Sequence, residues 1–426
     1  MMNYISTNNP DLKIGFKNAV YDGLAPDGGL YIPESIPVIE KTFLENLLSK
    51  DTNEIASQLL YPFVKEDLSS GQLTRIIQHT FQSEIPLRQI GDSGIHALEL
   101  FHGPTWAFKD IGARFLAGCL SAWSDGNEQV TILVATSGDT GGAVTNGFYR
   151  LPGTKVVILY PSGKISPLQE MQIAGQGENI HAIAVKGSFD DCQRLVKMAF
   201  SDKELRTSVT LTSANSINIG RWLPQMIYYA LAYKKITGKI TDPVICVPSG
   251  NYGNITAGML VHLMGFSFKK FIAAHNQNDT VPRFLKNGTY EPYDTIPTLA
   301  NAMDVSDPGN FERLKYVWKQ RAQNLKDIFS AQSVSDPEIL NAIRSCWEKH
   351  HYLLDPHTAT AWHVLNKERL EGIILSTAHP FKFEEVITTA LGFYPEEWKK
   401  KWKEVEVKKE VIEVNYKKLR EILLET

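Results

Sequence analysis

TILVATSGDTGGA, residues 131–143, is the stretch that decides the fold class of this 426-residue chain. It begins with an apolar run typical of a buried strand and ends in a glycine-rich turn that leads into a segment with helical spacing. Ligands of open α/β sheets bind at the carboxyl ends of strands, where glycines let backbone N–H groups approach an anion. A tight connection between a strand and a helix would carry the same glycines, so the turn alone leaves both interpretations open.

Other apolar runs alternate with amphipathic segments along the chain. Among the amphipathic segments, residues 189–200 place their apolar side chains on one helical face. Repetition of strand, helix and strand implies a parallel sheet covered on both faces, so we predict an α/β fold. The further predicted strands are 155–160, 181–185, 243–248 and 270–275.

Changes in the mix of turn residues, helical stretches and strand-like runs along the chain predict three units. Residues 1–95 combine a turn-rich start with longer helical stretches and are expected to form an N-terminal domain. Residues 96–220 are expected to form a smaller α/β domain that carries the SGDTG turn, and residues 221–426 a larger α/β domain. Its tail, residues 395–426, mixes basic and acidic side chains in nearly equal numbers, which predicts a solvated helical face.

The charge balance excludes several classes of function. With 44 Lys and Arg against 47 Asp and Glu, the formal charge is −3, so no global field draws the chain to nucleic acid or to an anionic membrane. The sequence has no leader pattern and no apolar run long enough to span a membrane, so we expect a cytoplasmic protein. Its four cysteines lie far apart, which predicts core residues and no metal site.

A second glycine-containing turn, SGNYGN at 249–254, follows the predicted strand 243–248 and opens a helix. Such a turn can present several N–H donors and the helix dipole to one phosphate. It matches neither the ATPase P-loop nor the dinucleotide-binding pattern, so a single monoester phosphate fits better. A purely structural turn is the alternative.

Lys109 stands in HGPTWAFKD, residues 102–110, directly after the apolar pair Ala107 and Phe108. A lysine that forms an imine with a carbonyl cofactor must be partly desolvated, because burial lowers its pKa and makes the neutral amine available. Together with the phosphate-binding turn, this setting indicates pyridoxal phosphate. Taken alone, a lysine in such a position is more often a surface residue that closes a turn.

Several segments, in this order, resemble the threonine synthase family. The resemblance covers the chain from about residue 15 to 385. It implies the tryptophan-synthase-β-like fold of pyridoxal-phosphate enzymes (fold type II) and the conversion of O-phospho-L-homoserine and water into L-threonine and phosphate, the last step of threonine biosynthesis. It further implies a small-molecule substrate, a monomer or homodimer, and no nucleic-acid or membrane partner. The segments are GLAPDGGLYIP (23–33), ELFHGPTWAFKDIGARFL (99–116), ATSGDTGGA (135–143), PSGKISPLQ (161–169), SANSINIGRWLPQ (213–225), PSGNYGN (248–254) and NAMDVSDPGNFER (301–313).

The same resemblance implies roles for individual residues. Lys109 would be the Schiff-base lysine, and Thr377, in the STAHP motif, would offer its hydroxyl to the pyridine nitrogen. The cofactor phosphate would be held by Gly250, Asn251, Tyr252, Gly253 and Asn254. The substrate would be bound by Ser137 and Thr140 at its carboxylate and by Lys164, Ser216, Asn218 and Arg221 at its phosphate.

Two further points concern charge at this site. Arg221 falls in the first turn of a helix predicted from residue 219 onward, next to its positive end. Asp139 stands where many relatives on the same fold have Asn near the cofactor's phenolic oxygen. Because a carboxylate there would repel a phenolate unless one of them is protonated, the contact of Asp139 is left open.

Two other functions compete with threonine synthesis. A serine or threonine dehydratase on the same fold would need no second phosphate site and would yield a keto acid. A catalytically idle relative would bind the cofactor or a phosphorylated ligand only as a sensor or assembly partner. Retention of Lys109 together with Lys164 and Arg221 disfavours both.

Overall fold

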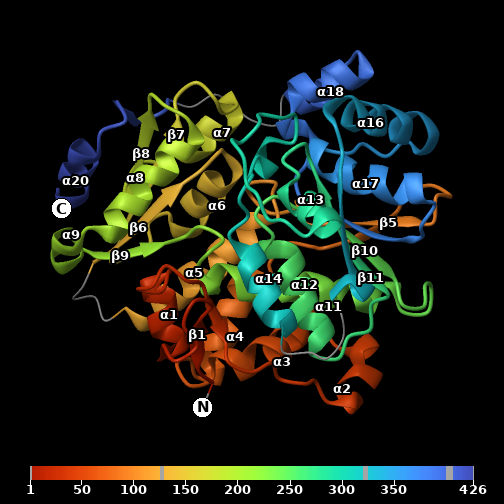
Figure 1. The fold of residues 1–426 in the computed structure, drawn as a ribbon, viewed down its shortest axis with the longest axis horizontal. Helices are drawn as coiled ribbons and strands as arrows, with labels where there is room; N and C mark the ends of the chain where they lie inside the picture. Colours follow the sequence, from red (N-terminus) through yellow and green to blue (C-terminus); the bar gives the residue numbers. More distant parts are fainter. Residues whose placement is uncertain (1, 125–128, 320–324, 400–405, 426) are drawn as a thin grey trace.

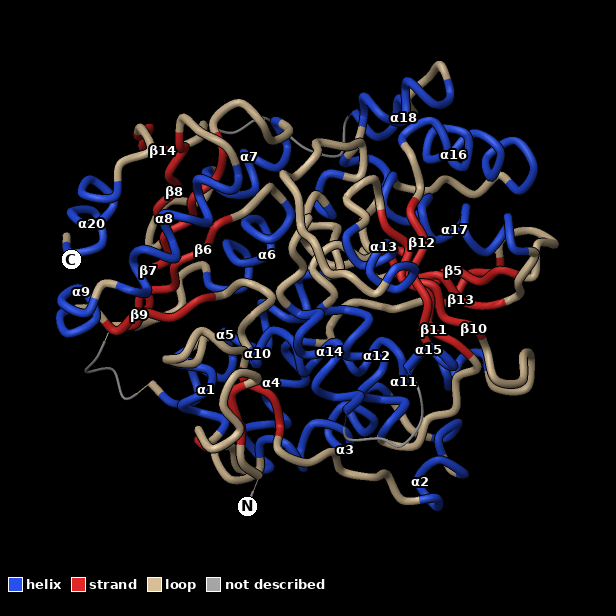
Figure 2. Tube along the Cα trace, in the orientation of Figure 1, coloured by secondary structure: helices blue, strands red, loops and turns tan. Residues whose placement is uncertain are grey.

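The computed structural model describes residues 2–124, 129–319, 325–399 and 406–425. Two largely parallel sheets lie on opposite sides of the molecule, and the N-terminal helices lie below and between them (Figure 1). Figure 2 shows helices on the flanks of both sheets, which confirms the predicted α/β class. Within the described residues, no helix has both the length and the apolar character needed to cross a membrane.

The first sheet has five strands, and every neighbouring pair is parallel. Its three central strands correspond to the predicted runs 131–136, 155–160 and 181–185, and nearly all of their side chains are buried. In spatial order the strands are β14 (Lys409–Ile412), β8 (Ile180–Val185), β7 (Thr154–Pro161), β6 (Val130–Ala135) and β9 (Thr210–Ser213).

The second sheet has six strands, and all pairs are parallel except the one at the β4 edge. The predicted strands 243–248 and 270–275 form its β10 and β11. In spatial order the strands are β12 (Phe329–Ser333), β11 (Lys270–His275), β10 (Val244–Pro248), β13 (Gly372–Ser376), β5 (Ile95–Glu99) and β4 (Leu87–Gln89).

The two sheets exchange strands along the sequence. The chain leaves the six-stranded sheet after β5, builds β6 to β9 of the five-stranded sheet, and then returns to form β10 to β13. Strand β14 finally rejoins the five-stranded sheet, beside β8. The division of the chain at residues 95 and 220 stays a prediction, but β5 and β14 each pair across it.

The N-terminal residues form a small antiparallel sheet and a set of helices that pack on the rest of the chain. The sheet has the order β2 (Lys13–Ile14), β1 (Tyr4–Ser6) and β3 (Tyr31–Pro33). Arg313 is fully buried and donates to the carbonyl oxygen of Tyr31 at 2.8 Å, so this unit is tied to the interior. Its helices are α1 (Phe16–Asp22), α2 (Lys41–Glu45), η1 (Leu47–Ser49), α3 (Thr52–Val64) and α4 (Ser70–Thr80).

The remaining helices connect the strands and cover the sheets. Helix α5 follows β5 and packs against α4, α6 and α10 in the middle of the molecule. The helices after the N-terminal unit are α5 (Lys109–Trp123), α6 (Asp139–Phe148), α7 (Pro167–Ala174), α8 (Phe189–Ser201), α9 (Lys203–Ser208), α10 (Ile219–Trp222), η2 (Leu223–Gln225), α11 (Met226–Ile236), α12 (Gly253–Leu263), α13 (Thr280–Asn287), η3 (Asn301–Met303), α14 (Asn310–Lys319), α15 (Leu325–Ile328), α16 (Asp336–His350), α17 (Pro356–Glu368), η4 (Pro380–Lys382), α18 (Glu384–Leu391), α19 (Glu396–Lys399) and α20 (Tyr416–Leu424).

Two sequence-based expectations about helices were wrong. The helix predicted from residue 219 is broken at Pro224 into α10, η2 and α11, because proline lacks the N–H that a continuous helix needs. The charged tail is not only a solvated helix, since β14 joins the sheet and the apolar side chains of α20 pack against α8. Residues 400–405 of that tail lie outside the described residues. The four cysteines are buried and free, as predicted.

Candidate active site

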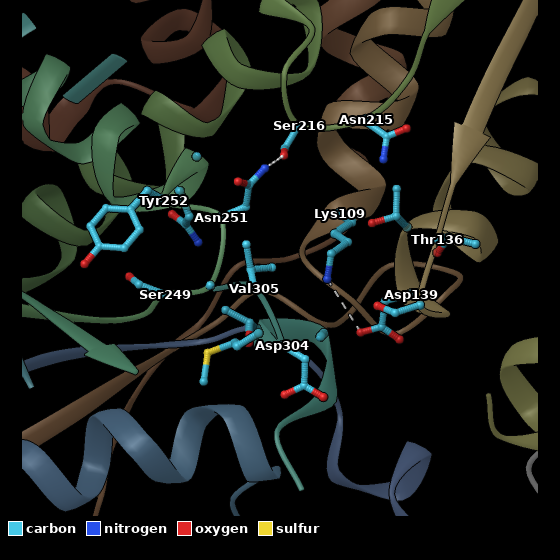
Figure 3. Close-up of a pocket in the computed structure, with 18 of the residues that line it drawn as sticks. Lys109, Thr136, Asp139, Asn215, Ser216, Ser249, Asn251, Tyr252, Asp304 and Val305 are labelled. Carbon is cyan, nitrogen blue, oxygen red and sulfur yellow. Dashed lines mark hydrogen bonds and ion pairs between the residues drawn. The ribbon is translucent and has the colours of Figure 1, made fainter. Parts of the chain in front are cut away.

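A cavity of about 260 Å³ lies between the two sheets, where the loops at the carboxyl ends of their strands meet (Figure 3). It brings together most of the predicted site residues. Those that line it are Lys109, Ser137, Thr140, Ser216, Arg221, Gly250, Asn251, Tyr252, Gly253, Asn254 and Thr377.

Lys109 is the first residue of α5, and only 17% of its side chain is exposed. The loop before it is fixed by two hydrogen bonds: the carboxylate of Asp110 accepts from the N–H of Thr105 at 3.0 Å, and Phe108 donates its N–H to the carbonyl oxygen of Thr377 at 2.9 Å. Burial lowers the pKa of Lys109, an effect that the nearby carboxylate of Asp139 opposes. The amine is therefore held in place and partly desolvated, as the sequence predicted.

Asp139 also contacts a second buried lysine, Lys382, which the sequence did not predict as a site residue. Its Oδ2 lies 3.7 Å from Nζ of Lys109, and its Oδ1 lies 2.6 Å from Nζ of Lys382. Burial alone would raise the pKa of Asp139, but the charges of Lys382 and Lys109 outweigh this effect and hold the pKa well below its ordinary value. The available signal was Lys382 itself, placed between Phe381 and Phe383 as Lys109 is placed after Phe108.

The turn at 250–254 is shaped for close approach to a ligand. Tyr252 has a φ of 65°, the left-handed region that non-glycine residues rarely adopt, and α12 begins at the next residue. A Cβ at Gly250 would lie 2.6 Å from the Cα of Met303, so only glycine fits there. The Tyr252 ring itself points away from Lys109 and its hydroxyl meets His275, so this residue can serve a ligand only through its backbone (Figure 3).

Asn254 supplies an unused donor at the start of α12. Its Oδ1 accepts from the hydroxyl of Tyr229 at 2.7 Å. Its Nδ2 is buried and has no hydrogen-bond partner within the described part of the chain. An orphaned donor at a helix N-terminus in a cavity fits an anion such as a phosphate.

The neighbouring Asn251 holds the turn to the opposite wall. It donates to the hydroxyl of Ser216 at 2.6 Å and accepts from the N–H of Gly309 at 2.7 Å (Figure 3). Asn251 is therefore occupied by protein contacts, whereas the hydroxyl hydrogen of Ser216 remains available to a ligand.

Arg221 is 4% exposed and lines the cavity. Its Nη1 donates to the carbonyl oxygen of Ala214, while its Nε has no partner among the residues that the structure describes. Burial lowers the pKa of Arg221 to about 10, so the group stays charged at neutral pH. Arg221 lies in the first turn of a helix, as predicted, but α10 spans only Ile219–Trp222, so its dipole contributes little. What favours an anion here is instead a buried guanidinium with unused donors.

Two predicted residues are not brought to the cavity. Asn218 is fully buried, but its side chain caps α10 and donates to the carbonyl oxygens of Val20 and Ser213, so no donor is left for a substrate. Lys164 is exposed in the turn after β7 and is not among the lining residues. A different lysine, Lys197 of α8, does line the cavity. Its position in an amphipathic helix gave no signal that separates it from a solvated lysine.

Comparison with known proteins shows which family the chain resembles. The family models that match are "Threonine synthase N terminus" over residues 3–81, "Pyridoxal-phosphate dependent enzyme" over 81–375 and "Threonine synthase, C-terminal" over 358–422. The threonine synthase of Serratia marcescens is 44% identical over 384 residues, 89% of each chain.

Two solved structures extend this likeness to the whole fold. The crystal structure of threonine synthase from Escherichia coli has a TM-score of 0.92 at 38% identity and covers 99% of both chains. The pyridoxal-phosphate-bound threonine synthase from Brucella melitensis has a TM-score of 0.90 at 32% identity and covers 100% of this chain and 99% of that one.

The residues in the cavity fit pyridoxal phosphate, the expected cofactor. Lys109 offers a buried amine, and the orphaned Nδ2 of Asn254 stands at the start of α12, where a phosphate would lie. The fold class and the cofactor expected from the sequence are confirmed. With matches along nearly its whole length, the chain belongs to the threonine synthase family of pyridoxal-phosphate-dependent enzymes.

Proposed function

We propose that this chain converts O-phospho-L-homoserine and water into L-threonine and phosphate. The observation that carries the proposal is one cavity in which the buried Lys109 is accompanied by two groups suited to anions, Asn254 and Arg221. The cofactor phosphate accounts for one of them. A dehydratase acting on serine or threonine has no substrate phosphate, so it would need no second phosphate site.

The cofactor is expected to lie between Lys109 and the carboxyl ends of β10 and β13. Lys109 would hold its carbonyl carbon, and the backbone of Gly250 to Gly253 with the amide of Asn254 would hold its phosphate. Thr377 stands at the end of β13 and lines the cavity, which supports a contact of its hydroxyl with the ring nitrogen. A neutral hydroxyl there would not force the ring to stay protonated.

The substrate is expected to lie between α6, α8 and α10. Ser137 and Thr140, at the start of α6, would bind its carboxylate. Arg221 and the hydroxyl of Ser216 would bind its phosphate. As the second cation for this phosphate, Lys197 has better support than Lys164, because only Lys197 lines the cavity.

Lys109 is the group expected to move protons. When bound, pyridoxal phosphate supplies an electron sink that acidifies the protons on the substrate's carbon chain. The amine of Lys109 would take the proton from Cα and then, as phosphate leaves Cγ, one from Cβ. It would return one proton to Cγ before water adds at Cβ and one to Cα afterwards, and the second proton of the water would leave with the phosphate. Arg221 holds the leaving group in line for its departure.

The experiment is to give the purified enzyme O-phosphohomoserine and to measure phosphate and threonine together. Equal amounts of both products are expected. In a parallel reaction, serine or threonine is supplied and keto acid is measured. Fast keto-acid formation without phosphate release would identify a dehydratase, and absence of any turnover despite bound cofactor would indicate a sensor.

We further propose a cytoplasmic location, because all four cysteines are buried free thiols, as suits a reducing compartment. A monomer or homodimer is expected, as the resemblance to threonine synthases implies.

A further inference from the structure

Lys382 is a buried lysine that the proposed mechanism does not use. Its side chain is 0% exposed. Its Nζ lies 2.6 Å from Oδ1 of Asp139 and donates to the carbonyl oxygen of Thr105 at 3.0 Å. Because burial of an ammonium is unfavourable unless partners replace its water, these contacts need a reason beyond packing.

The two oxygens of Asp139 have different partners. Oδ1 accepts from Lys382 and, at 3.1 Å, from Nε2 of Gln169. Oδ2 lies 3.7 Å from Nζ of Lys109, and Figure 3 shows this side of the carboxylate turned toward the lysine. Lys382 and Gln169 thus occupy one oxygen and leave the other to Lys109.

Lys382 also adds a contact between the two paired segments of the site, the loop before Lys109 and the loop after β13. The N–H of Phe108 donates to the carbonyl oxygen of Thr377 at 2.9 Å, and the N–H of His379 donates to that of Trp106 at 3.0 Å. The bond from Lys382 to the backbone of Thr105 lies at the end of this pairing. One side chain therefore joins the loop before Lys109, the loop after β13, and Asp139.

We propose that Lys382 is a positioning residue, which keeps Asp139 ionised and oriented so that Oδ2 faces Lys109 and thereby sets where the amine of Lys109 stands. The inference rests on the proposed function only for the role of Lys109. Asp139 is 2% exposed, and without Lys382 a carboxylate buried to this degree would keep only the amide of Gln169 and the more distant amine of Lys109.

The test compares four variants of the full-length protein: Lys382→Met, Asp139→Asn, the double variant, and Lys382→Arg, which keeps the charge. Two properties are measured without substrate. They are the unfolding temperature before and after cofactor loading, and the dissociation constant and visible absorption of bound pyridoxal phosphate.

Removal of one charge should be harmful and removal of both much less so. Lys382→Met should lower the unfolding temperature by roughly 3–6 °C and weaken cofactor binding by about tenfold or more, because a buried carboxylate loses its partner. It should also shift the absorption of the bound cofactor. The double variant should recover most of all three properties, and Lys382→Arg should lose less than Lys382→Met.

Additive losses in the double variant would overturn the proposal, because Lys382 would then support the fold through Thr105 or packing alone. If Lys382→Met does not fold, recovery of folded protein in the double variant supports the proposal. A double variant that fails to fold while Asp139→Asn folds contradicts it. Since no substrate is present, these results do not depend on whether the enzyme releases phosphate from O-phosphohomoserine.

Discussion

Replacement of Arg221 by alanine should separate threonine synthesis from the other reactions of this cavity. The guanidinium is almost fully buried, and its only hydrogen bond within the described residues is the one to the carbonyl oxygen of Ala214. Its remaining donors are available to a ligand. A charge-assisted hydrogen bond of this kind contributes about 1.5–3 kcal/mol, and a two-pronged contact with phosphate lies at the upper end of that range.

This free energy corresponds to a loss of about ten- to hundredfold in kcat/KM for O-phosphohomoserine. The loss should appear in phosphate release because the same contact positions the leaving group. Arg221→Lys is the matched control, since it keeps the charge but loses the planar fork, and it should lose less. Slow formation of keto acid from serine, which has no phosphate, should be nearly unchanged in both variants.

The assay follows phosphate release and keto-acid formation in the same preparation, with cofactor occupancy checked by absorbance. The alanine variant also leaves the carbonyl oxygen of Ala214 without this partner, so its unfolding temperature is recorded as well. If both activities fall together while the cofactor stays bound, Arg221 supports the fold or the reacting centre, and the assignment of the substrate phosphate to it is wrong.

Five other substitutions test the remaining assignments. Lys109→Ala should bind the cofactor noncovalently and lose turnover, and borohydride should fix the cofactor of the parent enzyme to the Lys109 peptide; recovery on another lysine would contradict this role. Thr377→Asp should shift the cofactor's absorption and slow catalysis, because a carboxylate favours the protonated ring; an unchanged spectrum and rate would mean that the hydroxyl faces elsewhere. Lys197→Ala should lower kcat/KM for O-phosphohomoserine by about tenfold while Lys164→Ala leaves it unchanged, and the reverse order would restore Lys164 as the second cation. Asn254→Ala should raise the dissociation constant of pyridoxal phosphate by about tenfold, measured by dialysis, and an unchanged constant would place the phosphate away from α12.

The central strands were predictable because their signal is local. A strand buried on both faces is a short apolar run bounded by turn residues, and 270–275 matches β11 at both ends. The prediction for the tail, residues 395–426, was wrong because the signal for its structure is not local. Its many charges hide the few apolar residues that matter, and Ile412 and Leu419 are recognised as core only when β8 and α8 are present to receive them.

The candidate site divides in a similar way. Lys109 and the turn at 250–254 could be predicted because the residues next to them in the sequence indicate their chemistry. Asn218 was assigned to the substrate because its amide could donate there, and only the carbonyl oxygens of Val20 and Ser213 reveal that it caps and ties a loop. Residues of the same type can therefore have different roles, and these roles are set by partners that lie far away along the chain.

The position of Lys382 explains how an aspartate can stand where the sequence raised an electrostatic objection. Lys382 and Arg221 both lower the pKa of Lys109 because like charges disfavour its ammonium, although burial lowers it most. With Asp139 between the two lysines, each ammonium has an opposite charge beside it. Asp139 also opposes the fall in the pKa of Lys109 that burial causes. The carboxylate is therefore best understood as a partner of the two lysines, which is why its replacement and that of Lys382 should compensate each other.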